Sequence, residues 1–220
     1  MWPFSSTIAS WKSWIYFLTS KSNTLAKFKI FHSMLKRQTS QKLLQLQSDR
    51  GGKFLSQEFN NYLITHGIIR ELTIARTSQQ NGVIKRKNWT MLNKLRFMLN
   101  GGRIPTFLWV EAVQTMVKLI NYTPTRTNPH TTPEEMFTGL KFDLSRIRVF
   151  GCIAHIHQGG NDKLASRSTV GAYLGTDVES KAYRVWVPSM HQMTSISIAS
   201  PQQCSPNSSS HFTDPTPNRP

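Results

Sequence analysis

Five cationic side chains gather in the stretch from about Gln80 to Asn100, and phosphate binding is the chemistry that their types permit. They are Lys85, Arg86, Lys87, Lys94 and Arg96. Lysine and arginine bind phosphate oxygens through charge-assisted hydrogen bonds, so this stretch predicts contacts to a nucleic-acid backbone. The alternative is a solvated basic face without a ligand, which is the usual explanation for a few lysines in a row.

The charge of the whole chain favours the nucleic-acid interpretation. The 220 residues include 27 Lys and Arg against 11 Asp and Glu, for a net charge of +16. Residues 1–103 hold 17 basic and three acidic side chains, whereas residues 104–220 hold ten and eight. An imbalance spread over a hundred residues favours a polyanionic partner. We therefore expect a polyanionic partner, of which nucleic acid is the favoured kind, while the oligomeric state stays undetermined.

Several other classes of protein are disfavoured by the same sequence. Cys152 and Cys204 lie far apart and lack the partners that a zinc site requires. The longest apolar runs, such as Trp14 to Leu18, are too short to span a bilayer, and no signal-peptide pattern opens the chain. We expect an intracellular protein, with the nucleus as a candidate compartment, and no membrane partner.

Strands and helices alternate in the first half, which predicts an α/β layer. Expected strands cover 14–18, 43–47 and 68–74, and expected helices cover 22–37 and 80–100. A helix capped by Ser56 and stopped by Gly67 should lie between the second and third strands. Ile84, Met91, Leu95 and Met98 form the apolar stripe of the long basic helix.

The sequence pattern is different in the second half of the chain. A helix beginning at Pro105 is apolar nearly all round and should be buried, and Thr132 to Glu135 form a capping box on a short helix. After Arg146 the period changes to two, which predicts a small β unit with strands at 148–156, 170–174 and 183–187. Beyond Ser189 the composition is polar, and we expect disorder.

Motifs in one order carry a resemblance to the integrases of copia-type retrotransposons. In the first half they are Ser48–Phe54, His66–Ile68, Gln79–Val83, Arg86–Asn88 and Phe107–Ala112. In the second half they are Asn121–Thr125, Thr132–Glu135, Arg148–Cys152, Gly171–Gly175 and Tyr183–Trp186. The resemblance implies an incomplete ribonuclease-H-like core, a mixed sheet with flanking helices, followed by a small Src-homology-3-like β-barrel and a disordered tail.

The resemblance also implies domain boundaries. Residues 1–12 would be an N-terminus outside the family, and 13–122 a partial integrase core. Residues 123–146 would be a linker with a short helix, 147–188 the small barrel, and 189–220 the tail.

An integrase of this family uses two Mg²⁺ ions, which hard carboxylate ligands must hold. The resemblance places three acids: one on the first strand, one after the central strand and one on the long helix. Asp49 matches the second acid, although without its neighbouring motifs it would pass for an ordinary turn residue. Lys85 stands at the third position, and residues 1–48 contain no acid at all, including Thr7 and Ile8, near which the first is expected.

These departures predict a chain that has lost catalysis. Asp49 alone should not hold a pair of ions, so we expect no cofactor. Lys85 would contact a DNA phosphate or be a surface lysine without a specific role. The expected function is DNA binding by a degenerate, inactive integrase fragment. Two alternatives stay open: an active two-metal integrase whose acids come from upstream sequence or another chain, and a co-opted protein-interaction module built on the barrel around Phe150 and Trp186.

Overall fold

A computed structural model describes residues 2–5, 10–48, 54, 56–72, 78–126, 128–157, 168–177 and 182–197, with backbone alone at 2–5, 21, 78–85, 87 and 197. The chain divides into two compact units that interleave in sequence. The first unit contains residues 1–90 and 121–142, and the second contains 91–120 and 143–220. The boundaries at 12, 122, 146 and 188 that were inferred from the family remain predictions.

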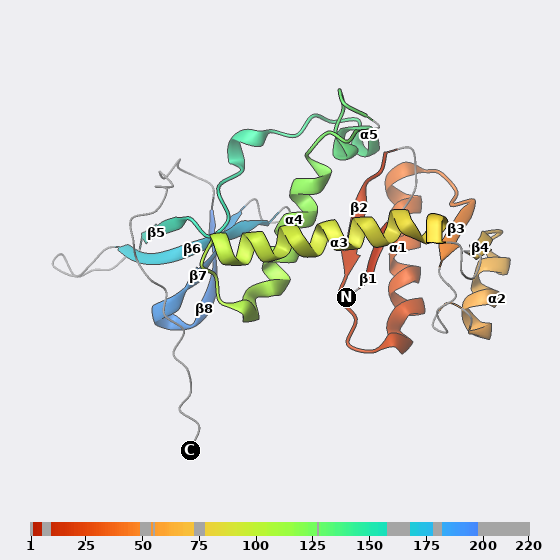
Figure 1. The fold of residues 1–220 in the computed structure, drawn as a ribbon, viewed down its shortest axis with the longest axis horizontal. Helices are drawn as coiled ribbons and strands as arrows, with labels where there is room; N and C mark the ends of the chain where they lie inside the picture. The colour runs from red at the N-terminus through yellow and green to blue at the C-terminus, as the bar shows by residue number, and fades with distance from the viewer. Residues whose placement is uncertain are drawn as a thin grey trace, which may run out of the picture. The chain divides into compact units, whose positions relative to one another are not determined.

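Two pairs of short strands form the sheets of the first unit (Figure 1). β1 (Trp2–Ser5) runs antiparallel to β2 (Ser13–Tyr16), and β3 (Gln45–Ser48) runs parallel to β4 (Ile69–Leu72). The last three strands were predicted, with ends shifted by one or two residues. β1 was not predicted, because it is short and Pro3 interrupts the strand pattern.

Helices follow the strands of this unit, and the predicted cap and stop residues of the second helix are present. A 3₁₀ turn, η1 (Lys21–Asn23), leads into α1 (Thr24–Thr39), and α2 (Gln57–Thr65) precedes β4. The Ser56 hydroxyl accepts a hydrogen bond from the Phe59 amide at 3.3 Å, as an N-cap should. Gly67, at φ 65°, occupies the left-handed conformation just after α2 and confirms the predicted stop.

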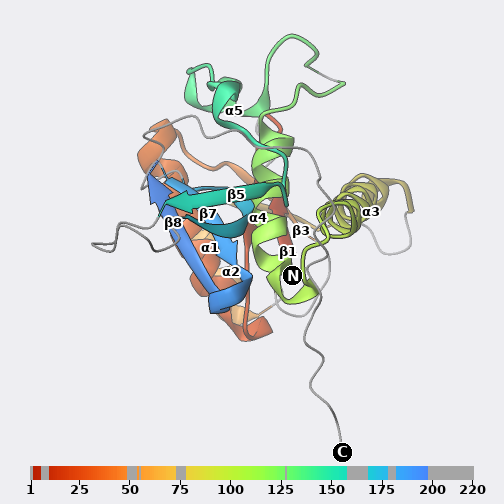
Figure 2. The same cartoon turned by 90° about the vertical axis from the view of Figure 1, so that its left-hand side faces the viewer.

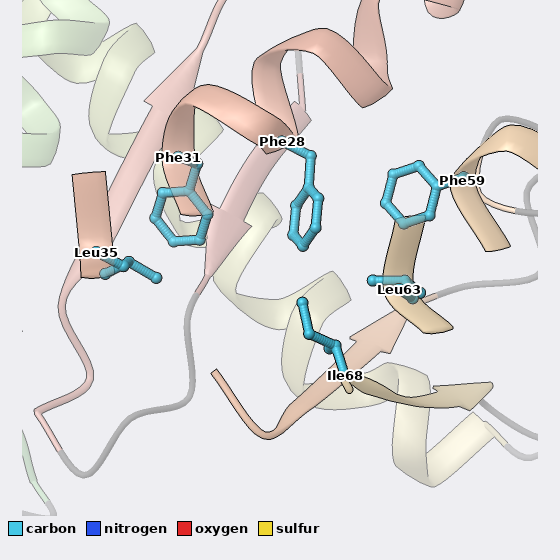
Figure 3. Packing of buried hydrophobic residues seen from close by; sticks show 6 residues of the cluster. All are labelled: Phe28, Phe31, Leu35, Phe59, Leu63 and Ile68. Carbon is cyan, nitrogen blue, oxygen red and sulfur yellow. The ribbon is translucent and has the colours of Figure 1, made fainter. Parts of the chain in front are cut away.

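One aromatic core joins both strand pairs to these helices (Figure 3). Figure 3 shows Phe28, Phe31 and Leu35 of α1 facing Phe59 and Leu63 of α2, with Ile68 closing the cluster. Phe28 and Phe59 are completely buried, and their ring centroids lie 5.1 Å apart. Trp14 of β2 meets Phe31 edge to face at 5.3 Å, so β2 shares the core that β3 and β4 border.

The segment 121–142 completes the first unit by packing against the start of β2. The amide side chain of Asn121 forms two 2.9 Å hydrogen bonds with Ser13, accepting from its N–H and donating to its carbonyl. α5 (Pro133–Thr138) carries the predicted Thr132 capping box, and Gly139 ends it at φ 71°. Glu134 of α5 forms a 2.8 Å ion pair with Lys12.

The second unit is built on the end of α3 (Ser78–Gly101), on η3 (Thr106–Leu108) and on α4 (Trp109–Asn121). Met91 and Leu95 are buried, as the predicted stripe requires. The helix after Pro105 was expected to be buried, and every residue from Val110 to Asn121 is indeed buried or half-buried. Its start is exposed, with Phe107 at 57% and Trp109 at 39%, because only one stripe, formed by Ala112, Val113, Met116 and Val117, packs inward.

Four antiparallel strands form the sheet of this unit, in the order β5, β6, β7, β8. They are β5 (Ile153–His157), β6 (Ser168–Asp177), β7 (Ala182–Val187) and β8 (Gln192–Ser197). Two 3₁₀ turns, η4 (Leu144–Arg146) and η5 (Pro188–Met190), precede β5 and β8. An α/β layer followed by a small β unit is the predicted fold class.

β8 corrects the prediction that disorder begins at residue 189. It pairs with β7 from Val187 opposite Gln192 to Ala182 opposite Ser197. Four of its six residues are polar, since it is an edge strand that backbone hydrogen bonds hold in place, and Ile196 packs against the core cluster that includes Val185. The rest of the predicted tail, from residue 198, lies outside the described residues.

Polar contacts fasten α4 to this sheet, and Figure 2 shows the helix beside the strands. Thr115 donates to the Leu174 carbonyl and Lys118 to the Thr176 carbonyl. Arg184 of β7 forms a 2.7 Å ion pair with Glu111. Burial between these groups lowers the pKa of Lys118, although Asp177 and Glu111 oppose the shift.

Candidate nucleic-acid interface

The predicted catalytic positions fall largely outside the part of the chain that the structure describes. Asp49 follows directly after β3, whose last residue, Ser48, is buried, but Asp49 itself is not described. Thr7 and Ile8, near which the first acid was expected, are not described either. The structure therefore places the strand that leads to Asp49 and leaves its role as a prediction.

Lys85 and Lys87 lie within α3, and only their backbone is described. No acidic residue occurs between Glu71 and Glu111, so α3 carries no carboxylate anywhere along its length. A carboxylate from α3 is thus missing whichever residue is aligned with the third acid. The helix offers ammonium and guanidinium groups instead.

Most acids in the described part of the chain already serve structural contacts. Glu111 and Glu134 are held in ion pairs with Arg184 and Lys12, both shorter than 3 Å. Glu135 accepts from the Thr132 amide in its capping box, and Asp143 accepts from the Ser145 amide at 2.9 Å. Hydrogen bonds from the Ser145 side chain and backbone lower the pKa of Asp143. Such carboxylates would have to break these contacts before they could bind a metal ion.

The donor set does not fit a pair of Mg²⁺ ions. Among the described residues, no three His, Cys, Asp or Glu side chains lie close enough to hold a metal ion. Asp49 would be a single anionic ligand, and Lys85 would add a positive charge at the position of a ligand. Hard divalent cations take oxygen ligands, and two of them also need negative charge to offset their mutual repulsion.

The cations of α3 whose side chains are described face solvent. Arg86, Lys94 and Arg96 are all exposed, as phosphate contacts require. Neither Lys94 nor Arg96 forms an ion pair with a described acid. The predicted basic helix is therefore present, and α3 itself contains no acidic residue that could neutralise its charge.

A second set of exposed cations lies on α1, in the first unit, and we did not predict that these residues contact nucleic acid. It consists of Lys29, Lys36 and Arg37. The signal was available, because Thr24–Thr39 contains four basic residues and no acid. The Lys29 ammonium lies 5.3 Å from the centre of the Tyr62 ring.

A histidine pair borders this basic helix. The rings of His32 on α1 and His66 after α2 meet edge to face at 5.2 Å, and a His32 ring nitrogen lies 3.0 Å from the Tyr62 hydroxyl. Burial lowers the pKa of His32, and the nearby His66 and Lys36 lower it further. His32 is therefore held in its neutral form to a lower pH than an isolated histidine.

Phe97 was missed as a surface residue by the sequence analysis. It falls outside the stripe of Met91, Leu95 and Met98, and its side chain is 80% exposed. That position off the stripe was the signal that could have identified it. Among the described residues, no helix is long and apolar enough to cross a membrane.

Comparison with known families identifies the small β unit. Residues 151–198 match the family of the retroviral polymerase SH3-like domain. The predicted Src-homology-3 type is thereby confirmed for this part of the chain, and the match includes β8.

Comparison with known proteins finds relatives that align with most of the chain. It is 38% identical over 182 residues to the retrovirus-related Pol polyprotein from transposon TNT 1-94 of Nicotiana tabacum, and 27% identical over 203 residues to that from transposon RE2 of Arabidopsis thaliana. These alignments cover 82% and 91% of the chain but only 14% of each polyprotein. The resemblance to plant copia-type Pol polyproteins is confirmed, and the chain spans a small part of their length.

Solved structures with some likeness to the chain are integrases. The magnesium-bound catalytic core domain of HTLV-2 integrase covers 58% of this chain and 78% of its own, at a TM-score of 0.44 and 21% identity. The catalytic core of BIV integrase covers 59% and 80%, at 0.43 and 20%. Scores this low do not by themselves establish a shared fold.

Proposed function

Since the chain corresponds to a segment of copia-type Pol polyproteins, we propose that it is an inactive remnant of the integrase core that binds DNA without cutting or joining it. Binding occurs through lysine and arginine contacts to phosphates and has no sequence preference. An intracellular, nuclear location belongs to the same proposal, because that is where chromosomal DNA lies.

The observation that carries the loss of catalysis is Lys85, at the position of the third acid. A unit charge about 4 Å from a cation is worth about 4 kcal/mol at an effective dielectric near 20. Exchanging a carboxylate for an ammonium replaces that attraction by a repulsion of similar size. Asp49 cannot offset this change for two divalent ions.

The exposed cations of α3 support the DNA-binding part of the proposal. Phosphate contacts position a protein on nucleic acid but carry no sequence information, and Arg86, Lys94 and Arg96 are suited to that role. The 17 basic side chains of residues 1–103 extend the positive field beyond this one helix.

An active integrase completed by acids from upstream sequence or another chain is the main alternative. It requires a carboxylate from elsewhere to reach the metal centre and to overcome the charge of Lys85. The second alternative, a protein-interaction module, requires Phe150 and Trp186 to contact a partner. Both are buried, at 9% and 6% exposed, so they are not available for that contact.

Binding is tested with a fluorescent 20-base-pair duplex of arbitrary sequence, titrated with the purified chain at several salt concentrations. For about four phosphate contacts, affinity should fall about a hundredfold between roughly 50 and 200 mM salt. Lys94→Gln should reduce the slope of log affinity against log salt by about one contact. Lys141→Gln removes an exposed lysine outside α3 and serves as the matched control. Affinity independent of salt would contradict the phosphate-contact account.

Catalysis is tested by nicking of supercoiled plasmid in Mg²⁺ or Mn²⁺. We expect no cleavage by the chain as it stands or by Lys85→Glu, because one restored acid still leaves the donor set incomplete. Cleavage that Asp49→Ala abolishes would establish the active alternative. Cleavage that survives Asp49→Ala would indicate a different site or a contaminating nuclease.

A further inference from the structure

An exposed aromatic ring lies among the cations of the last part of α3. Phe97 is 80% exposed, which is unusual for a side chain that gains so much from burial. Lys94 precedes it by three residues and Arg96 by one, and both are exposed. Residues three apart on a helix are neighbours on its surface, so the ring and the Lys94 ammonium share one patch.

The helix fixes which way this patch faces. Met91 and Leu95 are 2% and 8% exposed, so the side of α3 that carries them packs in the core of the second unit. At 100° per residue, Phe97 falls on the opposite side, toward solvent. Its exposure follows from its position on the helix, because a side chain at residue 97 lies outside the core whatever its type.

The ring also has open space beside it. Gly101 lies one turn further along α3, and a Cβ added there would meet nothing within 4 Å. Asn93, one turn earlier, is half-buried. A flat group could therefore lie against the Phe97 ring without displacing a described side chain.

The Lys94 ammonium beside the ring argues against a protein partner. Lysine is depleted at protein interfaces, although aromatic residues and arginine are enriched there. Here the aromatic is flanked by two cations that form no ion pair with a described acid. An aromatic ring beside cations suits a ligand that has both a flat face and a negative backbone.

We propose that Phe97 stacks an unpaired nucleobase while Lys94 and Arg96 bind the adjoining phosphates, so that this face of α3 prefers single-stranded nucleic acid over duplex. The inference rests on the proposed nucleic-acid binding and specifies its ligand. Bases within a duplex are stacked on each other and cannot offer their faces, whereas single-stranded bases stack on exposed aromatic rings.

The test measures affinity for a 20-nucleotide oligothymidine and for a 20-base-pair duplex by fluorescence anisotropy, using the full chain at one salt concentration. Phe97→Ala should weaken single-strand binding about tenfold, the equivalent of one stacked base, and leave duplex binding within twofold. Leu92→Ala is the matched control, because Leu92 is an exposed apolar residue of the same helix, at 44%, and should change neither affinity.

The outcomes separate this inference from the function on which it rests. Replacing Lys94 and Arg96 together by Gln should weaken both ligands, since phosphates are common to both. Equal affinity for the two ligands, or unchanged binding by Phe97→Ala, would overturn the stacking site and leave DNA binding intact. Failure of the unaltered chain to bind either ligand would overturn both. Restoration of single-strand affinity by Phe97→Trp, a larger stacking surface, would support the site.

Discussion

The hydrogen bonds between Asn121 and Ser13 give the sharpest test of how the first unit is held together. Asn121 and Ser13 are 6% and 1% exposed, so water does not readily replace the amide side chain. Asn121→Ala leaves one N–H and one carbonyl of Ser13 without a partner. Each unsatisfied buried group costs about 1–3 kcal/mol, so we expect a loss of about 2–4 kcal/mol in the free energy of unfolding, with partial water entry favouring the lower value.

The assay is urea denaturation followed by tryptophan fluorescence and far-ultraviolet circular dichroism. Trp14 is next to Ser13 in β2 and reports on this region. Asn61→Ala is the matched control. Its side chain is exposed and bonds only to the Gln57 amide at 3.1 Å among the contacts described for it, so its loss should cost less than about 0.5 kcal/mol.

A second variant separates the hydrogen bonds from side-chain volume. Asn121→Asp keeps the acceptor for the Ser13 amide but loses the donor, and it buries a negative charge at the last residue of α4, where the helix dipole is also negative. It should be less stable at pH 7 than Asn121→Ala. Equal stability of the unaltered chain and Asn121→Ala would refute the reasoning, because it would show that neither hydrogen bond contributes.

Two further predictions concern pH and backbone space. Because the folded pKa of His32 is lowered from 6.5, the unfolded chain takes up the proton first as pH falls, so stability should decrease from about pH 7 to 5. His32→Gln should reduce this dependence in urea titrations at each pH, and an unchanged slope would contradict the assignment. At Gly151, with φ 81°, an added Cβ would lie 2.6 Å from the Gly102 Cα, so Gly151→Ala should cost about 2 kcal/mol or more. Gly101→Ala, with open space, should instead be neutral or stabilising by up to about 1 kcal/mol in thermal melts.

Local signals in the sequence were enough for most of the elements. The Thr132 capping box, the Ser56 cap and the Gly67 stop depend on residues within a few positions of each other, and each appears in the structure as predicted. The apolar stripe through Met91 and Leu95 likewise follows from helical period alone. The small β unit was predicted from its period of two.

Features that depend on distant partners could not be predicted in the same way. β8 is mostly polar in sequence, and it is held by the hydrogen bonds that β7 offers along its edge. The bonds from Asn121 to Ser13 join residues 108 positions apart, and no local pattern indicates them. The exposed start of α4 reflects which stripe meets the sheet, and apolar composition alone does not determine that stripe.

Of the candidate interface, the sequence identified the cations of α3 but not the ring beside them. An aromatic residue in a helix is usually counted toward the core, and only its register relative to Met91 and Leu95 shows that Phe97 points outward. The catalytic acids were assigned through family resemblance. Asp49 lies outside the described residues, so its role remains a prediction.

The interleaving of the two units has a consequence for how the chain is made. Residues 121–142 complete the first unit, yet the ribosome produces them only after thirty residues that belong to the second. Ser13 and Lys12 therefore lack their partners Asn121 and Glu134 until late in synthesis, and the first unit cannot finish folding before residue 142 has emerged. Expression of residues 1–90 alone would leave the N–H and carbonyl of Ser13 without these hydrogen bonds.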